Sequence, residues 1–144
     1  MARYPVHIAV MGAALMAPLS QQVAAQNPDR VLSVELNSLE PSQAGCRLSF
    51  VAASTLESDV EKVAYEMVLF DARGMVERIT VFDFRDLPAG KTRVRQFDLS
   101  GAECAAISRI LVNDAKSCTG PGLDPAACMR RLRTATRSTV AFSD

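Results

Sequence analysis

The 144-residue sequence contains no tryptophan and a single histidine, His7. His7 lies in an N-terminal segment that we expect to be removed, so the mature chain has no imidazole. Without one it cannot build a Ser-His-Asp or Cys-His nucleophile, or a histidine-ligated zinc or copper site. The sequence also has no C-x-x-C pair, which argues against a thioredoxin-like redox centre.

Net charge is the second thing that the chain lacks, because 16 Lys and Arg residues balance 16 Asp and Glu residues. Aromatic residues make up only 6% of the sequence. Binding to nucleic acid needs an excess of positive charge, and single strands also need aromatic rings for stacking. We therefore expect no nucleic-acid partner.

The first 25 residues have the three-part pattern of a secretory signal peptide. A short basic start is followed by an apolar run, Ile8 to Leu19, and by small residues at Val23-Ala24-Ala25. The apolar run is too short for an ordinary transmembrane helix. We expect cleavage after Ala25 and export to the periplasm or the medium, leaving one domain, residues 26–144; an uncleaved anchor helix is the alternative.

Four cysteines remain in the exported chain: Cys46, Cys104, Cys118 and Cys128. An even number of cysteines in a small exported protein is typical of disulfides rather than of a metal site. Spacing alone leaves three pairings open. If each successive strand reverses direction, Cys46 and Cys104 lie at one end of the fold and Cys118 and Cys128 at the other, which favours these two pairs.

The centre of the fold is predicted to be a hairpin, Val60 to Phe84. Val63, Tyr65, Met67 and Leu69 fall on one side of an extended chain, while apolar residues also occupy the other side, as in a central strand. The turn Asp71-Ala72-Arg73-Gly74 suits a reversal, because Asp binds backbone amides ahead of it and Gly accepts a positive φ.

The remaining pattern predicts further strands at 31–37, 45–54, 92–98 and 106–113, beside the hairpin strands 60–70 and 75–84. A bulge near Gln96 would bring Val94 onto the same face as Phe97 and Leu99. A short helix, Ala126 to Arg133, and a last strand, about Thr134 to Phe142, complete the chain. Seven antiparallel strands of this length favour an all-β, immunoglobulin-like sandwich; a partly open barrel is the alternative.

Three features together resemble small exported modules of bacteria. These are the runs VLFDARGMVERI and PAGKTRVRQFDL and the signal peptide. Over about residues 31–113 the chain is similar to immunoglobulin-like or fibronectin-like periplasmic modules, many of them uncharacterised. The resemblance implies a β-sandwich and no catalytic residue. The part with Cys118, Cys128 and the arginine-rich helix departs from a minimal module.

Charge is distributed unevenly along the chain. Residues 26–90 carry six Lys or Arg and eleven Asp or Glu, whereas residues 91–144 carry nine and five. Arginine forks bind carboxylate and phosphate groups. The candidate residues for an anion-binding or partner-binding face are Arg93, Arg95, Arg130, Arg131, Arg133 and Arg137. The alternative is a solvated surface whose arginines pair with acids such as Glu35, Glu61, Glu66 and Glu77.

Other candidates for chemistry are weaker. Asp71, Asp83 and Asp86 would supply Ca²⁺ ligands or an acid–base pair only if the fold joined them, and Glu57, Asp59 and Glu61 form an acidic edge. Ser108 or Ser117 with Lys116 lacks the motif of a Ser–Lys enzyme. The aromatic and Met side chains of the hairpin are typical of core rather than of a ligand pocket.

These observations favour a non-catalytic exported module that binds a protein or an anionic envelope component and needs no cofactor or metal. Two other functions stay open. One is an inhibitor or chaperone that acts by strand addition to a sheet edge. The other is a histidine-free hydrolase or lyase, which would need carboxylates gathered in a concave site.

Overall fold

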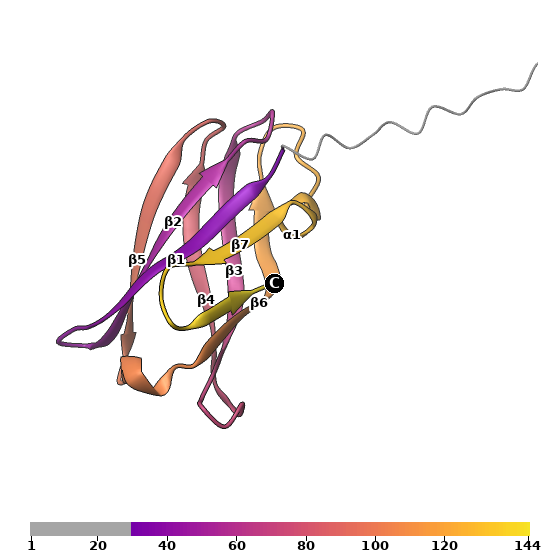
Figure 1. Ribbon diagram of the computed structural model, residues 1–144. Helices are drawn as coiled ribbons and strands as arrows, with labels where there is room; N and C mark the ends of the chain where they lie inside the picture. The colour runs from indigo at the N-terminus through magenta and orange to yellow at the C-terminus, as the bar shows by residue number, and fades with distance from the viewer. Residues whose placement is uncertain (1–29) are drawn as a thin grey trace, which may run out of the picture.

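The computed structural model describes residues 30–144, so the predicted signal peptide and its cleavage site lie outside the described residues. Within this part the chain forms eight strands in two packed sheets (Figure 1). The elements are β1 (Leu32–Pro41), β2 (Gly45–Ser54), β3 (Val60–Phe70), β4 (Val76–Leu87), β5 (Thr92–Ser100), a 3-10 turn η1 (Cys104–Ala106), β6 (Arg109–Thr119), α1 (Ala127–Arg130), β7 (Leu132–Thr136) and β8 (Ala141–Ser143).

The two sheets each contain four strands within residues 30–144. Sheet A has the order β5-β2-β1-β7 and sheet B the order β4-β3-β6-β8. Most neighbours are antiparallel, but β7 pairs in parallel with β1, and β8 pairs in parallel with β6. The predicted all-β sandwich is therefore confirmed, and β3 is a central strand of sheet B, as its two apolar faces predicted.

The core lies between the sheets and is lined by alternate residues of each strand. Phe50 of β2 contributes the central ring, because its ring contacts those of Phe82, Phe84, Phe97 and Phe142 with centroid distances of 5.4–6.0 Å. Burying aromatic side chains of this size supplies much of the driving force for folding. The hairpin rings were thus correctly interpreted as core, apart from Phe70, which lies under the Arg109 guanidinium on the outer face of sheet B.

The C-terminal part differs from its prediction. The helix is one short turn, Ala127–Arg130, and the chain is already extended at Leu132, which is fully buried beside Leu32 of β1. The predicted last strand is two strands, one in each sheet, so residues 30–144 form eight strands rather than seven. Parallel pairing with β1 and β6 overrides the local helical preference of this arginine-rich stretch.

The predicted bulge near Gln96 is wrong. Strand β5 pairs with β2 in an unbroken register from Thr92 to Ser100. Regular alternation therefore turns Val94 outward, where it is 62% exposed, while Phe97 and Leu99 face the core.

Both predicted disulfides are confirmed, Cys46–Cys104 and Cys118–Cys128. The first ties the start of β2 to η1, and the second ties β6 to α1. The hydroxyl of Tyr65 donates a hydrogen bond of 2.9 Å to the carbonyl of Cys128. Burial raises the pKa of this phenol well above its ordinary value, so it stays protonated and keeps the bond. Disulfides persist in oxidising compartments, so the two bonds fit an extracytoplasmic location.

Candidate functional site

The six candidate arginines do not form one surface. Arg93 and Arg95 lie on β5, whereas the other four lie between α1 and the start of the β7–β8 connection. Strands β5 and β7 are the opposite edges of sheet A. The predicted anion-binding face is therefore divided by the width of the sheet.

Arg93 and Arg95 are turned toward the interior and hold the two sheets together. Arg95 donates to the backbone carbonyls of Phe84 (2.6 Å) and Asp86 (3.0 Å) and to the Asp86 carboxylate (3.1 Å), and Arg93 reaches the same carboxylate at 3.3 Å. Burial raises the pKa of Asp86, but the hydrogen bond from Arg93 and the two positive charges outweigh it, so the pKa lies below its ordinary value. This Asp86 clamp joins the edge strand of one sheet to the edge strand of the other.

The other four arginines also have local contacts. Arg130 pairs with Asp124, Arg137 pairs with Glu35 at 2.8 Å, and Arg133 donates to the carbonyl of Leu132. The hydrogen bond from Arg137 lowers the pKa of Glu35, and the one from Arg130 lowers that of Asp124. Arg130 and Arg131 line a hollow at the α1 end of the sandwich.

The candidate carboxylates are separated by the length of β4. Asp71 lies in the turn before β4, whereas Asp83 and Asp86 lie near its other end. Asp86 belongs to the clamp, and Asp83 accepts the backbone N–H of Arg85. Glu57 pairs with Arg30, and Asp59 accepts the N–H of Ala89. No group of three possible metal ligands occurs among residues 30–144.

Of the Ser–Lys candidates, Ser108 and Lys116 are held by hydrogen bonds to neighbouring residues. The hydroxyl of Ser108 donates to the carbonyls of Phe70 (3.1 Å) and Asp71 (2.5 Å). Hydrogen bonds to Asp114 and then Glu66 raise the pKa of Lys116. A general base of this type needs a lowered pKa, so the environment of Lys116 favours the opposite protonation state.

A different feature of the molecule stands out, which is an apolar ridge on and beside β4. Large apolar side chains that are more than half exposed are concentrated there within residues 30–144: Met75 (61%), Val76 (54%), Ile79 (58%) and Val81 (51%), with Val94 (62%) on β5. We call Met75, Val76, Ile79 and Val81 the β4 ridge. In a soluble domain, neighbouring exposed apolar side chains of this size indicate a surface for interaction.

The ridge runs along a free sheet edge. Strand β4 is the outermost strand of sheet B, so one side of its backbone has no strand partner among residues 30–144. Its pairing with β3 shifts register near Val76 and again near Arg85, where φ is +61°. Between these irregularities, Arg78 to Asp83 pairs with β3 in regular register. Six residues of regular edge are therefore open to another strand.

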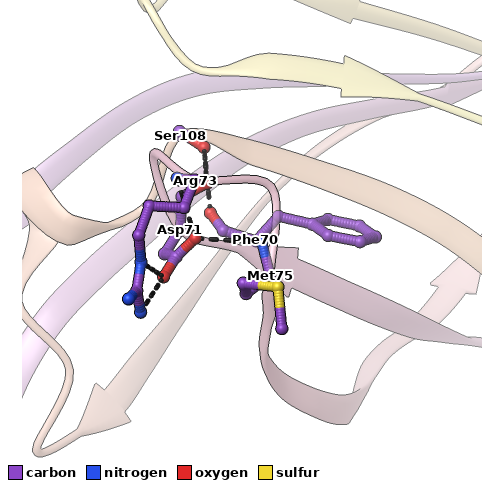
Figure 2. Close-up of polar contacts among 5 residues, drawn as sticks. All are labelled: Phe70, Asp71, Arg73, Met75 and Ser108. Carbon is purple, nitrogen blue, oxygen red and sulfur yellow. Dashed lines mark hydrogen bonds and ion pairs between the residues drawn. The ribbon is translucent and has the colours of Figure 1, made fainter.

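The hairpin tip that leads into β4 is rigidly built (Figure 2). The Asp71 carboxylate accepts the backbone N–H groups of Arg73 and Met75, both at 2.9 Å, and pairs with the Arg73 guanidinium. The Met75 amide bond and then the Arg73 side chain lower the pKa of Asp71, and Gly74 takes φ +78° as the turn predicted. Met75 is thus presented at the start of the ridge on a fixed backbone.

A hollow of about 480 Å³ separates the two free edges, and its walls come from both. It is lined by Val81, Asp83 and Arg85 of β4 and by Val94, Arg95, Gln96 and Phe97 of β5. The opposite side of the sandwich is closed by residues 137–140, which cross from sheet A to sheet B.

Residue patterns missed this ridge, although a signal was present. Ile79 and Val81 alternate with the buried Phe82 and Phe84 along β4. That alternation indicated two apolar faces, and only the strand order shows that the outer one belongs to an edge strand.

No helix among residues 30–144 is long and apolar enough to cross a membrane.

Comparisons with known proteins find one similar solved structure and no related family. No family model matches the sequence, and no curated protein matches it. Among solved structures, the chain is similar to the Salmonella enterica trimeric lipoprotein SadB, with 18% sequence identity and a TM-score of 0.44. The match covers 51% of this chain and 42% of that chain, so it spans less than half the length of SadB.

Proposed function

We propose that this protein is a non-catalytic exported module, periplasmic or secreted, that binds an extended segment of another protein by strand addition to β4. The observation that carries the proposal is the β4 ridge beside a regular free edge. The signal-peptide pattern and the two disulfides support export, and the resemblance to exported immunoglobulin-like modules supports a binding role. The candidate carboxylates are dispersed, which favours binding over carboxylate catalysis.

Strand addition suits this edge for two reasons. The backbone of Arg78 to Asp83 offers hydrogen bonds to an added strand, and Ile79 and Val81 supply apolar contacts at alternate positions. We therefore expect the partner to contribute about six residues with apolar side chains at every second position. The inhibitor or chaperone function, which the sequence left open, uses this same geometry.

The test is a selection of random twelve-residue peptides on the mature protein. We expect selected peptides to alternate apolar and polar residues and to protect amides of β4 from hydrogen exchange. The double variant Ile79→Lys/Val81→Lys should lose this binding, because it places two charges on the ridge. The control, Ala135→Lys, should retain it, because Ala135 is exposed on β7, on the other side of the sandwich from the β4 edge.

Two results would overturn the proposal. One is the absence of any enriched peptide. The other is a set of peptides that bind the double variant and the wild-type protein equally well.

A further inference from the structure

The hollow at the α1 end of the sandwich gathers arginines from parts of the chain that are far apart in sequence. Arg30 precedes β1, whereas Arg130 and Arg131 belong to α1 and the residue after it. The hollow measures about 230 Å³ and opens to solvent. It lies at the opposite end of the molecule from the β3–β4 hairpin tip (Figure 1).

The polar wall of this hollow carries an excess of positive charge. Its arginines, Arg30, Arg130 and Arg131, face two acids, Glu57 and Asp124. Arg30 pairs with Glu57 and Arg130 with Asp124. A guanidinium has five N–H donors, so an arginine with one ion pair keeps donors for a second acceptor.

The other wall is apolar. Leu56 and Leu123 are partly buried and pack against the core, and Ala127 is buried beside them. An apolar wall next to guanidinium groups fits an anion that carries a small aliphatic group. A volume of 230 Å³ is below the range of about 300–1,000 Å³ that is usual for drug-sized ligands, so the occupant must be small.

The scaffold around the hollow is fixed by several independent contacts. The Cys118–Cys128 disulfide and the hydrogen bond from Tyr65 to Cys128 hold α1 on sheet B. The N–H of Leu32 donates to the carbonyl of Arg131 at 2.9 Å, which ties α1 to β1. Groups held in this way bind a ligand without a further cost of ordering.

From this arrangement we propose that the hollow binds an aliphatic carboxylate, with the carboxylate on Arg30 and Arg130 and the aliphatic group on Leu56 and Leu123. This site is separate from the β4 ridge and stands or falls independently of it. A carboxylate of this kind occurs at the C-terminus of a protein chain and in small free acids.

The test is an NMR titration of the mature protein with N-acetylleucine through the millimolar range, following the Leu56 and Leu123 methyl groups. We expect saturable shifts with N-acetylleucine and none with N-acetylleucinamide, which lacks the charge. Arg130→Gln should weaken binding about ten-fold, the effect of one charge-assisted hydrogen bond. Arg73→Gln is the matched control, because Arg73 is also an arginine paired with an aspartate.

A second variant gives an effect of the opposite sign. Glu57→Gln removes the acid that competes for Arg30, so we expect binding to become several-fold tighter. A merely structural role for these residues would not produce tighter binding. 4-Methylpentanoate and a pentapeptide ending in free leucine distinguish the two sources, since a site for chain ends should bind the pentapeptide more tightly.

The proposal is overturned if N-acetylleucine causes no saturable shift of the two leucines, or if the amide binds as well as the acid. Failure here leaves the peptide selection on β4 unaffected, because that experiment reads out a different end of the molecule.

Discussion

Strands β4 and β5 follow each other in sequence and form the two free edges on the same side of the sandwich. They differ in the side chains that they expose there. Strand β5 turns the polar Thr92, Gln96 and Asp98 outward with a single large apolar side chain, Val94, and points Arg93 and Arg95 inward. Inward-pointing charge is a known way to prevent a sheet edge from recruiting another strand. Strand β4 instead keeps apolar side chains on its outer face over a regular stretch of edge.

This contrast teaches that, on one side of a sandwich, the edge of one sheet can be protected against pairing with another strand while the edge of the other sheet stays available for it. The Asp86 clamp links the two edges, so the protected strand also fixes the position of the available one. The four predictions that follow test this relation, from the largest expected effect to the smallest.

The largest loss of stability should come from removing an aromatic ring that faces the core. Phe84 of β4 is fully buried and contacts the rings of Phe50, Tyr65 and Phe97. Phe84→Ala should lower the free energy of unfolding by about 3–5 kcal/mol, the usual cost of removing a buried ring. Phe97→Ala on β5 should cost less, because Phe97 is only partly buried. Urea denaturation measures both, with Phe84→Leu as a milder change; equal losses at the two positions would contradict the different burial.

Removing the Asp86 clamp should cause the second-largest loss of stability. Arg95→Met keeps much of the side-chain volume but removes hydrogen bonds to Phe84 and Asp86, so we expect a loss of about 1–2 kcal/mol. Hydrogen exchange should then show faster opening along both β4 and β5. Faster exchange of β5 alone would mean that the clamp does not position β4.

The clamp also predicts a pH dependence with a definite sign. The folded pKa of Asp86 lies below the ordinary value of about 4, so its contribution to stability is complete above that pH. The contribution is lost as the pH falls through the lowered folded pKa. Urea titrations at falling pH should therefore show a shallower decline in stability for Asp86→Asn than for the wild-type protein.

The smallest effect concerns the turns that precede the two edges. Gly74 before β4 and Gly90 before β5 have φ of +78° and +72°, and a Cβ at either position meets nothing within 4 Å. Gly74→Ala and Gly90→Ala should each cost about 1 kcal/mol, from backbone conformation alone. Thermal denaturation measures this loss. Asp71 holds the first turn from its side chain, so a larger loss at Gly90 would show that this network absorbs the strain.

Local patterns predicted the parts of the fold that local chemistry determines. The bounds of β2 and β3 agree with the prediction, because alternation and turn residues mark them directly. The Asp71 turn was predicted for the same reason, whereas the two disulfide pairs were predicted from the alternating direction of successive strands. The C-terminal strands were not, since Leu132 is extended only because β1 lies beside it.

The candidate site shows the same limit. Arginines of the positively charged segment 91–144 were expected to share a face, but the order of sheet A separates Arg93 from Arg133. The pairing of β4 on one side only, which exposes the ridge, likewise depends on contacts between distant segments. The hollow joins Arg30 to Arg130 across a hundred residues, and no local pattern predicts that meeting.

The crossing of residues 137–140 between the sheets has a consequence for biogenesis. Strands β7 and β8 follow β1 and β6 in sequence, so a chain folded only as far as β6 has both β1 and β6 uncovered on their outer sides. Covering that side therefore requires residues 132–143, which contain both strands. A chain truncated shortly before Leu132 would therefore have unpaired strand edges on both sides of the sandwich, and such edges favour aggregation.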